Sequence, residues 1–194
     1  MQEALAKHFA PAECLVLGCR LQPFSLWHWR LFDQLDLPLW PGEFTTPLLE
    51  LVQAVRLLCL PANSDWKKVL RALRVHPLRL GWIGFTQGRR IFAHEEALGA
   101  YLQHYFTGPL AKTTGDGPGT PINTHPALYL AMGLVRAGLS ESEAWATPPG
   151  FARWKLAAAA EADGHEVRIV SDSDIALARE AGYTEEQIFG RRAA

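Results

Sequence analysis

A stretch rich in glycine and proline divides this chain of 194 residues into two parts. Residues 107–121 read TGPLAKTTGDGPGTP, a composition that interrupts helices and strands, and we interpret it as a mobile linker. The segments on both sides show helical periodicity instead. The sequence therefore predicts a mainly α protein with two helical halves, an N-terminal region over 1–106 and a C-terminal region over 125–194, joined by a linker over 107–124. A single continuous domain remains the alternative.

Four helices are expected in the first half, and three of them follow a residue that favours a helix N-terminus. Ser25, Thr46 and Ser64 can each accept a hydrogen bond from a free N–H group of the first helical turn. The glycine-punctuated stretch LGWIGFTQGRR, residues 80–90, is left outside these helices. The expected helices cover residues 26–35, 47–60, 65–75 and 94–106, and residues 1–10 could form a further short one.

The second half carries the clearest helix boundaries. Ser140 and Glu143 have the spacing of a capping box, in which each side chain binds the backbone N–H of the other residue. Pro148 and Pro149 then start a helix that runs through four alanines to Gly164. The remaining expected elements are a helix over 125–137 that stops at Gly138, short strands around 15–22 and 166–170, and one or two short helices over 171–190.

Bulk composition restricts where the protein acts. The formal net charge of -1 gives no general attraction to nucleic acid or to an anionic membrane. No segment approaches the roughly 18 uninterrupted apolar residues of a membrane-spanning helix, and the N-terminus lacks the apolar region of a signal peptide. Cys14, Cys19 and Cys59 are odd in number and lie in mostly apolar sequence, which indicates reduced thiols. We therefore expect a soluble, cytoplasmic protein without a membrane partner.

The sequence offers little that would support catalysis or metal binding. His94-Glu95-Glu96 lacks the second histidine that would place two imidazoles on one helix face, and no two cysteines have C-x-x-C spacing. The stretch GPLAKTT, residues 108–114, lacks the glycine that precedes the lysine of a phosphate-binding loop. We therefore predict no catalytic residue, no metal site and no cofactor. A small enzyme of unfamiliar type would need a pocket in which several of the seven histidines converge.

Basic residues cluster between positions 67 and 90, and no acidic residue interrupts them. Such a patch can contact phosphates or an acidic protein surface. A solvated helix face opposite acidic helices of the same molecule explains the pattern equally well. Three of the cations, Lys67, Arg71 and Arg74, share one face of the helix expected over 65–75. The full cluster comprises Lys67, Lys68, Arg71, Arg74, Arg79, Arg89 and Arg90.

Residues 145–164, WATPPGFARWKLAAAAEADG, allow three interpretations. A helix-turn-helix fits the outline around Gly138, but a recognition helix presents polar side chains to base edges and this segment continues as alanines. Catalysis needs a group that titrates near neutral pH, and before its acidic end the segment carries only one arginine and one lysine. An apolar interface fits better, because Phe151 and Trp154 lie three residues apart on one helix face. Together with Trp145 they suit an internal core as well.

Two stretches resemble small helical proteins encoded in the tail-gene region of tailed bacteriophages. They are GCRLQPFSLWH, residues 18–28, and HPALYLAMGLVRAGLSESEAWATPPGFARWKLAAAAEADG, residues 125–164, and the resemblance extends over about half of the chain. The nearest similarity is to tail assembly chaperones, which hold the long tape-measure protein soluble while the tail tube polymerises around it. The resemblance implies a role in tail assembly, with the tape-measure or tail-tube protein as partner, and no catalytic chemistry.

The leading hypothesis is therefore a non-enzymatic phage morphogenesis protein that binds other phage structural proteins in the host cytoplasm or in the virion. A homo-oligomer is compatible with it. Two alternatives remain, a helix-turn-helix DNA-binding regulator or packaging factor and another virion connector component, although the charge balance disfavours nucleic acid as a partner. The candidate interface residues are the aromatic and basic side chains of Trp27, Trp29, Lys67, Arg71, Arg74, Trp145, Phe151 and Trp154.

Overall fold

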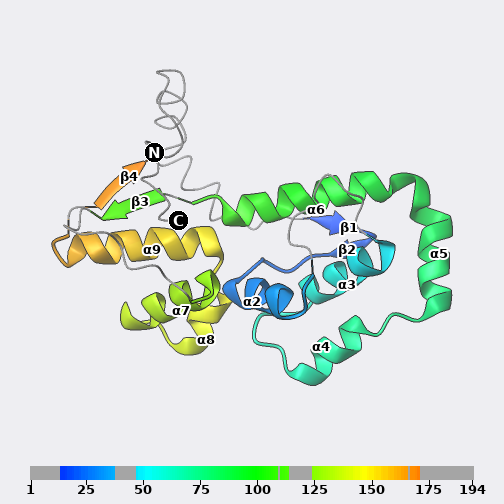
Figure 1. Ribbon diagram of the computed structural model, residues 1–194, viewed down its shortest axis with the longest axis horizontal. Coiled ribbons are helices and arrows are strands. Elements are labelled where there is room, and N and C mark those ends of the chain that lie inside the picture. Colours follow the sequence, from blue (N-terminus) through cyan, green and yellow to red (C-terminus); the bar gives the residue numbers. More distant parts are fainter. Residues whose placement is uncertain (1–13, 38–46, 109, 114–123, 166, 171–194) are drawn as a thin grey trace, which may run out of the picture.

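The protein is mainly α-helical, as the sequence predicts, with two small two-stranded sheets (Figure 1). The computed structural model describes residues 14–37, 47–108, 110–113, 124–165 and 167–170. The helices expected over 1–10 and 171–190 lie outside these residues. In chain order the elements are β1 (Leu15–Val16), β2 (Cys19–Arg20), α2 (Leu26–Gln34), α3 (Leu48–Leu58), α4 (Trp66–Leu73), α5 (Pro77–Gln87), the 3₁₀ helix η1 (Gly88–Arg90), α6 (Ile91–Phe106), β3 (Leu110–Thr113), α7 (Pro126–Arg136), α8 (Glu141–Ala146), α9 (Pro149–Ala162) and β4 (Val167–Val170).

β1 and β2 form a hairpin with a two-residue turn, within the region where a strand was expected. Leu17 and Gly18 have φ values of +51° and +72°, and a type I′ turn requires a positive φ at both of its central residues. A leucine rarely adopts this conformation. Here its backbone N–H donates to Nδ1 of His94 at 3.4 Å, which links the turn to α6.

α2 begins at a cap that a buried histidine completes. The Ser25 hydroxyl lies 2.9 Å from Nδ1 of His28, and the Ser25 backbone N–H donates to the same nitrogen at 3.3 Å. Nε2 lies 3.0 Å from the carbonyl oxygen of Leu60, which can only accept, so Nε2 carries the proton. Burial lowers the pKa of His28 to about 4, because the charged imidazolium would be poorly solvated there. The neutral ring therefore ties the start of α2 to the segment that follows α3.

Two apolar clusters form the core, and α2 contributes to both. Phe32 belongs to the first cluster, which also contains residues of the β1–β2 hairpin, α3, α4 and α6. Leu26 belongs to the second cluster, with residues of α7, α8 and α9. Trp29 packs against both clusters. The backbone N–H of Leu26 also donates to the carbonyl oxygen of Thr147 at 2.9 Å, so the start of α2 is fixed to the end of α8.

The start of α9 approaches the end of α6 so closely that only glycine fits. A Cβ added at Gly150 would lie 3.0 Å from the carbonyl oxygen of Tyr105 and would overlap that of Thr107. A Cβ added at Gly108 would lie 2.8 Å from Cα of Gly150. The two halves distinguished in the sequence therefore touch through their backbones. Their assignment as separate regions stays a prediction, because only the folding of the isolated halves can decide it.

The interpretation of residues 107–121 as a mobile linker is wrong for β3. This strand pairs antiparallel with β4 in the register Leu110↔Val170, and β4 lies where a strand was expected. The sequence pattern did not reveal β3, because the neighbouring glycines and prolines dominate the composition and its pairing partner lies far along the chain. Strand formation depends on such partners more than on the intrinsic preference of the residues.

α5 was not predicted as a helix. Its sequence, PLRLGWIGFTQ, contains two glycines that each lower helix stability by about 1 kcal/mol relative to alanine. The helix starts nonetheless, because Nδ1 of His76 accepts the N–H of Leu78 at 3.3 Å and Pro77 occupies the first helical position. Gly84 has a packing role, since an added Cβ would lie 3.3 Å from Cδ2 of Leu48 on α3.

Other helix boundaries agree with the sequence or shift by a few residues. Gly138 follows the end of α7 with a φ of +96°, and Pro149 opens α9, as expected. The cap of α4 is Asp65 rather than Ser64, because the Asp65 carboxylate accepts the N–H of Lys68 at 2.9 Å. In the part of the chain that the structure describes, no helix combines the length and apolarity needed to cross a membrane.

The predicted capping box at the start of α8 is confirmed. The N–H of Glu143 donates to the Ser140 hydroxyl at 3.3 Å, and the N–H of Ser140 donates to the Glu143 carboxylate at 3.0 Å. The hydrogen bonds from Ser140 also lower the pKa of Glu143, because they favour the charged carboxylate.

Replacing Ser140 with alanine should lower the free energy of unfolding by about 1 kcal/mol, because the backbone N–H of Glu143 in the first turn loses its acceptor. Urea denaturation monitored by circular dichroism measures the change. Ser64→Ala is the matched control, since the Ser64 hydroxyl donates to the carbonyl oxygen of Pro61 and caps no helix. It should change stability by less than about 0.5 kcal/mol. Equal losses in both variants would argue against the capping role.

Candidate protein-binding surface

α5 carries apolar side chains on two opposite faces. Leu80 and Ile83 lie on the inner face and are half-buried. Leu78, Trp82 and Phe85 follow one another at helical spacing on the outer face, and they are 79%, 66% and 85% exposed. A surface helix normally exposes polar residues on the face opposite its buried stripe. The outer face of α5 therefore has the composition of a contact face, and no described residue covers it.

α4 also exposes apolar side chains. Val69 and Ala72 point into the first cluster, whereas Trp66 and Leu70 are 54% and 40% exposed. Trp82 and Phe85 on α5 contact each other with ring centroids 6.4 Å apart. We use the name α4–α5 surface for the exposed apolar residues of these two helices together with the exposed basic residues of α4, α5 and η1. Its apolar members are Trp66, Leu70, Leu78, Trp82 and Phe85.

Side chains of α3 hold α4 in place. The guanidinium of Arg56 donates to the carbonyl oxygens of Arg71 and Arg74 at 2.9 and 2.6 Å. Nε2 of Gln53 donates to the carbonyl oxygen of Leu73 at 3.0 Å. These carbonyls lie in the last turn of the helix, where they have no partner within it. Arg56 and Gln53 thus fix the C-terminal end of α4 to the core.

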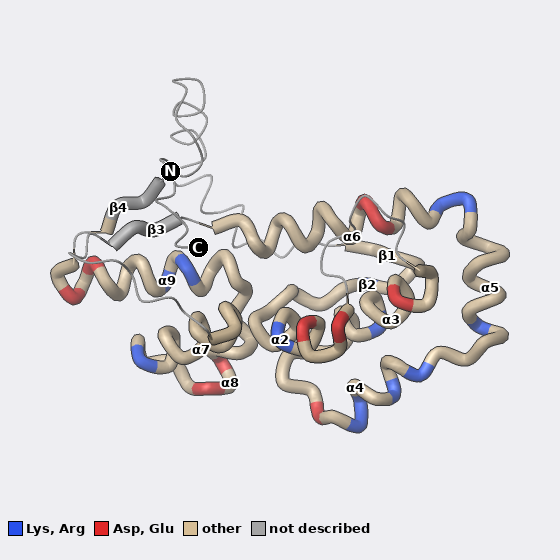
Figure 2. The backbone as a smooth tube through the Cα atoms, in the orientation of Figure 1, with Lys and Arg blue, Asp and Glu red and all other residues tan. Residues whose placement is uncertain are grey.

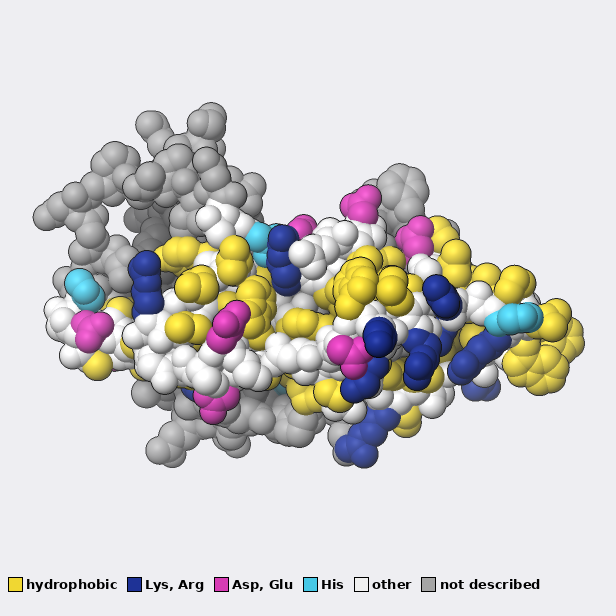
Figure 3. All heavy atoms as spheres, turned by 90° about the horizontal axis from the view of Figure 1, so that it is seen from below, with side chains coloured by type: hydrophobic (Ala, Val, Ile, Leu, Met, Phe, Trp, Pro, Cys, Tyr) yellow, Lys and Arg dark blue, Asp and Glu magenta, His cyan; other side chains and the backbone are white. Residues whose placement is uncertain are grey.

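The α4–α5 surface is strongly basic. All seven cations of the cluster predicted from the sequence are exposed, and they run along α4, α5 and η1 (Figures 2 and 3). Lys68 lies 3.7 Å from Asp65, but both side chains are 58% exposed, and such pairs contribute little to stability. Within the described ranges none of the other six has a carboxylate partner. The alternative explanation was that acidic helices of the same molecule neutralise this basic face. For these six cations, no ion pair among the described residues supports that explanation.

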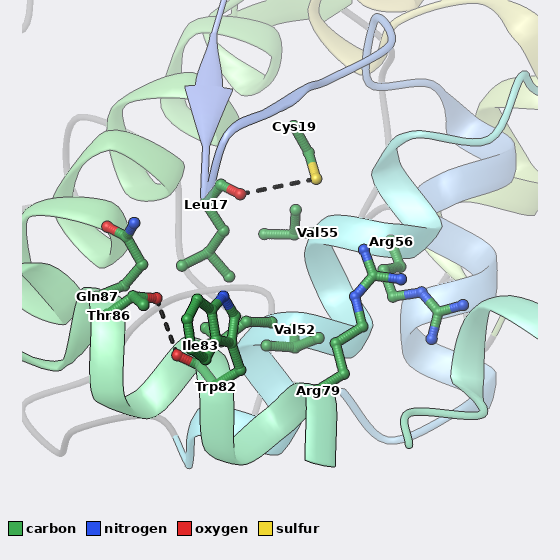
Figure 4. A pocket seen from close by; sticks show the side chains of 10 residues that line it. All are labelled: Leu17, Cys19, Val52, Val55, Arg56, Arg79, Trp82, Ile83, Thr86 and Gln87. Carbon is green, nitrogen blue, oxygen red and sulfur yellow. Dashed lines mark hydrogen bonds between the residues drawn. The ribbon is translucent and has the colours of Figure 1, made fainter. Parts of the chain in front are cut away.

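Two adjoining hollows lie beside this surface. The first has a volume of about 240 Å³ and lies between α3, α5 and the β1–β2 turn, with Val52, Val55 and Leu17 among its lining residues (Figure 4). The second, of about 360 Å³, lies between α3 and α4. Cys19 and Arg56 line both hollows. The two hollows therefore adjoin at these two side chains, and we call them together the groove.

The Cys59 thiol in the groove is not activated. The Cys59 thiol donates to the carbonyl oxygen of Arg20 at 3.5 Å. Burial and the adjacent Cys19 thiol raise the pKa of Cys59 to about 11, so it stays protonated near neutral pH. A protonated thiol is a poor nucleophile and metal ligand, so Cys59 serves as an apolar lining residue. In the described parts of the chain, no three histidine, cysteine, aspartate or glutamate side chains are placed to hold a metal ion.

The aromatic residues predicted for an interface are all half-buried, and they are spread over α2, α8 and α9. Trp27 and Trp29 are half-buried on α2, and the Trp29 ring lies 4.8 Å from that of Phe106. Trp145 packs against the second cluster. Phe151 and Trp154 are half-buried on α9, where Nζ of Lys155 lies 4.8 Å from the Phe151 ring centroid.

The predicted basic residues have a different environment. Lys67, Arg71 and Arg74 are exposed on α4, whereas the predicted aromatic residues lie on α2, α8 and α9 (Figure 1). α5 follows α4 along the chain and exposes Trp82 and Phe85, which the sequence interpretation missed. The spacing of Leu78, Trp82 and Phe85 was the available signal, but the glycines between them concealed the helix.

α9 is the helix that would read bases in a helix-turn-helix. It contacts α6, α7 and both strands of the β3–β4 sheet. Arg153 donates to the carbonyl oxygen of Phe106 at 3.5 Å, and partial burial lowers the pKa of its guanidinium. A recognition helix needs a free polar face to enter the major groove. The placement of α9 therefore gives the DNA-binding alternative no support.

Comparisons of this chain with known protein families, with curated proteins and with solved structures give no match.

Proposed function

We propose that this protein binds and holds another phage structural protein during tail assembly, without catalysing a reaction. The observation that supports the proposal best is the exposed outer face of α5, formed by Leu78, Trp82 and Phe85. Burial of one large apolar side chain contributes on the order of 1.5–3 kcal/mol, so a partner that covers this face would gain considerable binding free energy. The resemblance to tail assembly chaperones implies that the partner is the tape-measure or tail-tube protein.

The mixture of apolar and basic side chains suits a chaperone-like role. A protein that keeps an apolar client soluble must expose apolar side chains and remain soluble itself. Charged residues around an apolar patch limit self-association. On the α4–α5 surface exposed cations lie on the same helices as the aromatic residues and on the adjoining η1, and their common sign disfavours contact between two copies of the same surface.

Coexpression with the tape-measure protein, and separately with the tail-tube protein, tests the proposal. We expect the wild-type chain to copurify with one of them. The double variant Trp82→Ala/Phe85→Ala should retain at least about tenfold less partner, because truncation of aromatic residues at the centre of an interface costs about 2 kcal/mol or more. Both side chains are exposed, so the variant should unfold at the temperature of the wild type.

The control variant removes two other exposed apolar side chains, on a different helix. Tyr129 and Met132 on α7 are 53% and 50% exposed, and Tyr129→Ala/Met132→Ala should leave the partner bound. A wild-type chain that stays alone in both coexpressions would overturn the proposal. Binding to duplex DNA that weakens steeply with salt would favour the regulator or packaging factor. Copurification with mature particles would favour the virion connector component.

A further inference from the structure

We infer that the groove receives an acidic, apolar segment of the partner, with one apolar side chain in the first hollow and carboxylates opposite Arg71 and Arg79. The inference rests on the proposed function and specifies the chemistry of its client. It concerns the groove between α3, α4 and α5 rather than the outer face of α5 alone.

The first hollow has the size and lining for a single apolar side chain. Its volume of about 240 Å³ lies below the roughly 300–1,000 Å³ that is typical of small-molecule sites. Val52, Val55 and Ile83 supply apolar walls, and Trp82 lies along one side (Figure 4). Trp82 belongs to both the hollow and the exposed α4–α5 surface. A segment that places a side chain in the hollow therefore also contacts Trp82.

The charges along the groove select an acidic occupant. Arg56, Lys68, Arg71 and Arg79 line it, and no acidic residue is among the lining residues of either hollow. Arg56 is already bonded to the carbonyl oxygens at the end of α4. Arg71 and Arg79 are exposed and have no carboxylate partner among the described residues. Carboxylates on the occupant would supply the complementary charge, which raises the association rate and discriminates between partners.

Other occupants fit the groove less well. A second copy of this chain in a symmetric dimer would present the same cations to the groove, and like charges repel. Nucleic acid would match the cations and leave the apolar hollow unfilled. An acidic segment with an apolar anchor uses both features.

Binding of defined peptides to the full chain tests the inference. Four fluorescent peptides of equal length combine two apolar contents, leucine and phenylalanine or serine, with two charges, glutamate or lysine. We expect fluorescence anisotropy to detect binding of the peptide that contains glutamate with leucine and phenylalanine. The other three should bind at least about tenfold more weakly, a difference of about 1.4 kcal/mol.

Two charge-reversal variants locate the site. Arg71→Glu/Arg79→Glu places two carboxylates in the groove, and we expect it to weaken binding of the acidic apolar peptide at least about tenfold. Arg89→Glu/Arg90→Glu makes the same change in net charge at exposed residues that line neither hollow, and it should weaken binding less than about threefold.

Each other outcome contradicts the inference. Equal losses in the two variants would mean that the overall charge, and not the groove, attracts the peptide. Equal binding of the serine peptide and the peptide with leucine and phenylalanine would show that no apolar side chain anchors the segment in the first hollow. Displacement of the peptide by duplex DNA would show that the groove binds nucleic acid instead. If no peptide binds while the tape-measure or tail-tube protein still copurifies, the groove inference fails and the proposed function stands.

Discussion

Replacing Gly150 with alanine should destabilise the protein by about 3 kcal/mol, near the upper end for insertion of a methyl group into a well-packed site. The new Cβ would meet the backbone carbonyls of Tyr105 and Thr107, which cannot rotate away as a side chain can. α9 would therefore have to move away from the end of α6. For a chain of this length the midpoint of thermal unfolding should fall by roughly 6–12 °C.

Gly81→Ala provides the matched control in α5. An added Cβ at Gly81 has no atom within 4 Å, so the same chemical change meets no obstacle. Alanine in an exposed helix interior should raise stability by about 0.5–1 kcal/mol, because the unfolded chain loses conformational freedom. Calorimetry or urea denaturation of both variants measures the difference. A Gly150→Ala protein as stable as wild type would show that α6 and α9 do not make this contact.

Acidification should remove about 3 kcal/mol of stability through His28 alone. Its pKa is about 4 in the folded protein, against the ordinary histidine value of 6.5 in the unfolded chain. Above pH 6.5 both states hold a neutral imidazole, and the stability contributed by the neutral ring is fully present. As the pH falls from 6.5 to about 4, the unfolded state binds the proton first and the folded state loses stability. A difference of 2.5 pKa units corresponds to about 3 kcal/mol.

Urea denaturation at several pH values between 7 and 4 measures this loss. His28→Gln should be less stable than wild type at pH 7, because Ser25 and Leu60 lose their shared partner. Its stability should depend less on pH over the same interval, since the titrating group is gone. His165→Gln removes an exposed histidine and should keep the wild-type dependence. A His28→Gln profile parallel to wild type would show that His28 titrates normally in the folded protein.

The sequence predicted features that depend on neighbouring residues, and it did not reveal features that depend on residues far along the chain. The capping box of Ser140 and Glu143, the stop at Gly138 and the start at Pro149 depend on neighbours within a few residues, and these predictions are confirmed. β3 depends on β4 near the end of the described chain, and no local pattern announces that pairing. Gly150 could not be recognised either, because its role arises from the backbone of α6.

The sequence predicted the positive charge of the candidate site but not which apolar side chains are exposed there. The uninterrupted run of cations from Lys67 to Arg90 stands in the sequence, and the structure places those residues on one exposed surface. The size of the tryptophans on α2, α8 and α9 favours them as interface anchors in the sequence, but the exposed fraction of each side chain depends on the helices packed around it. Trp82 and Phe85 are exposed because they lie on the face of α5 opposite its contacts with α3, which no periodicity in their own segment reveals.

Among the described α-helices, α5 is the one that contributes no buried residue to either apolar cluster. Its hydrogen bonds can break without exposing the core, so we infer that it opens locally at a free energy well below that of global unfolding. A client that covers α5 would supply the second layer that the helix lacks. Binding would then suppress local opening, and client release would be coupled to fraying of the same helix.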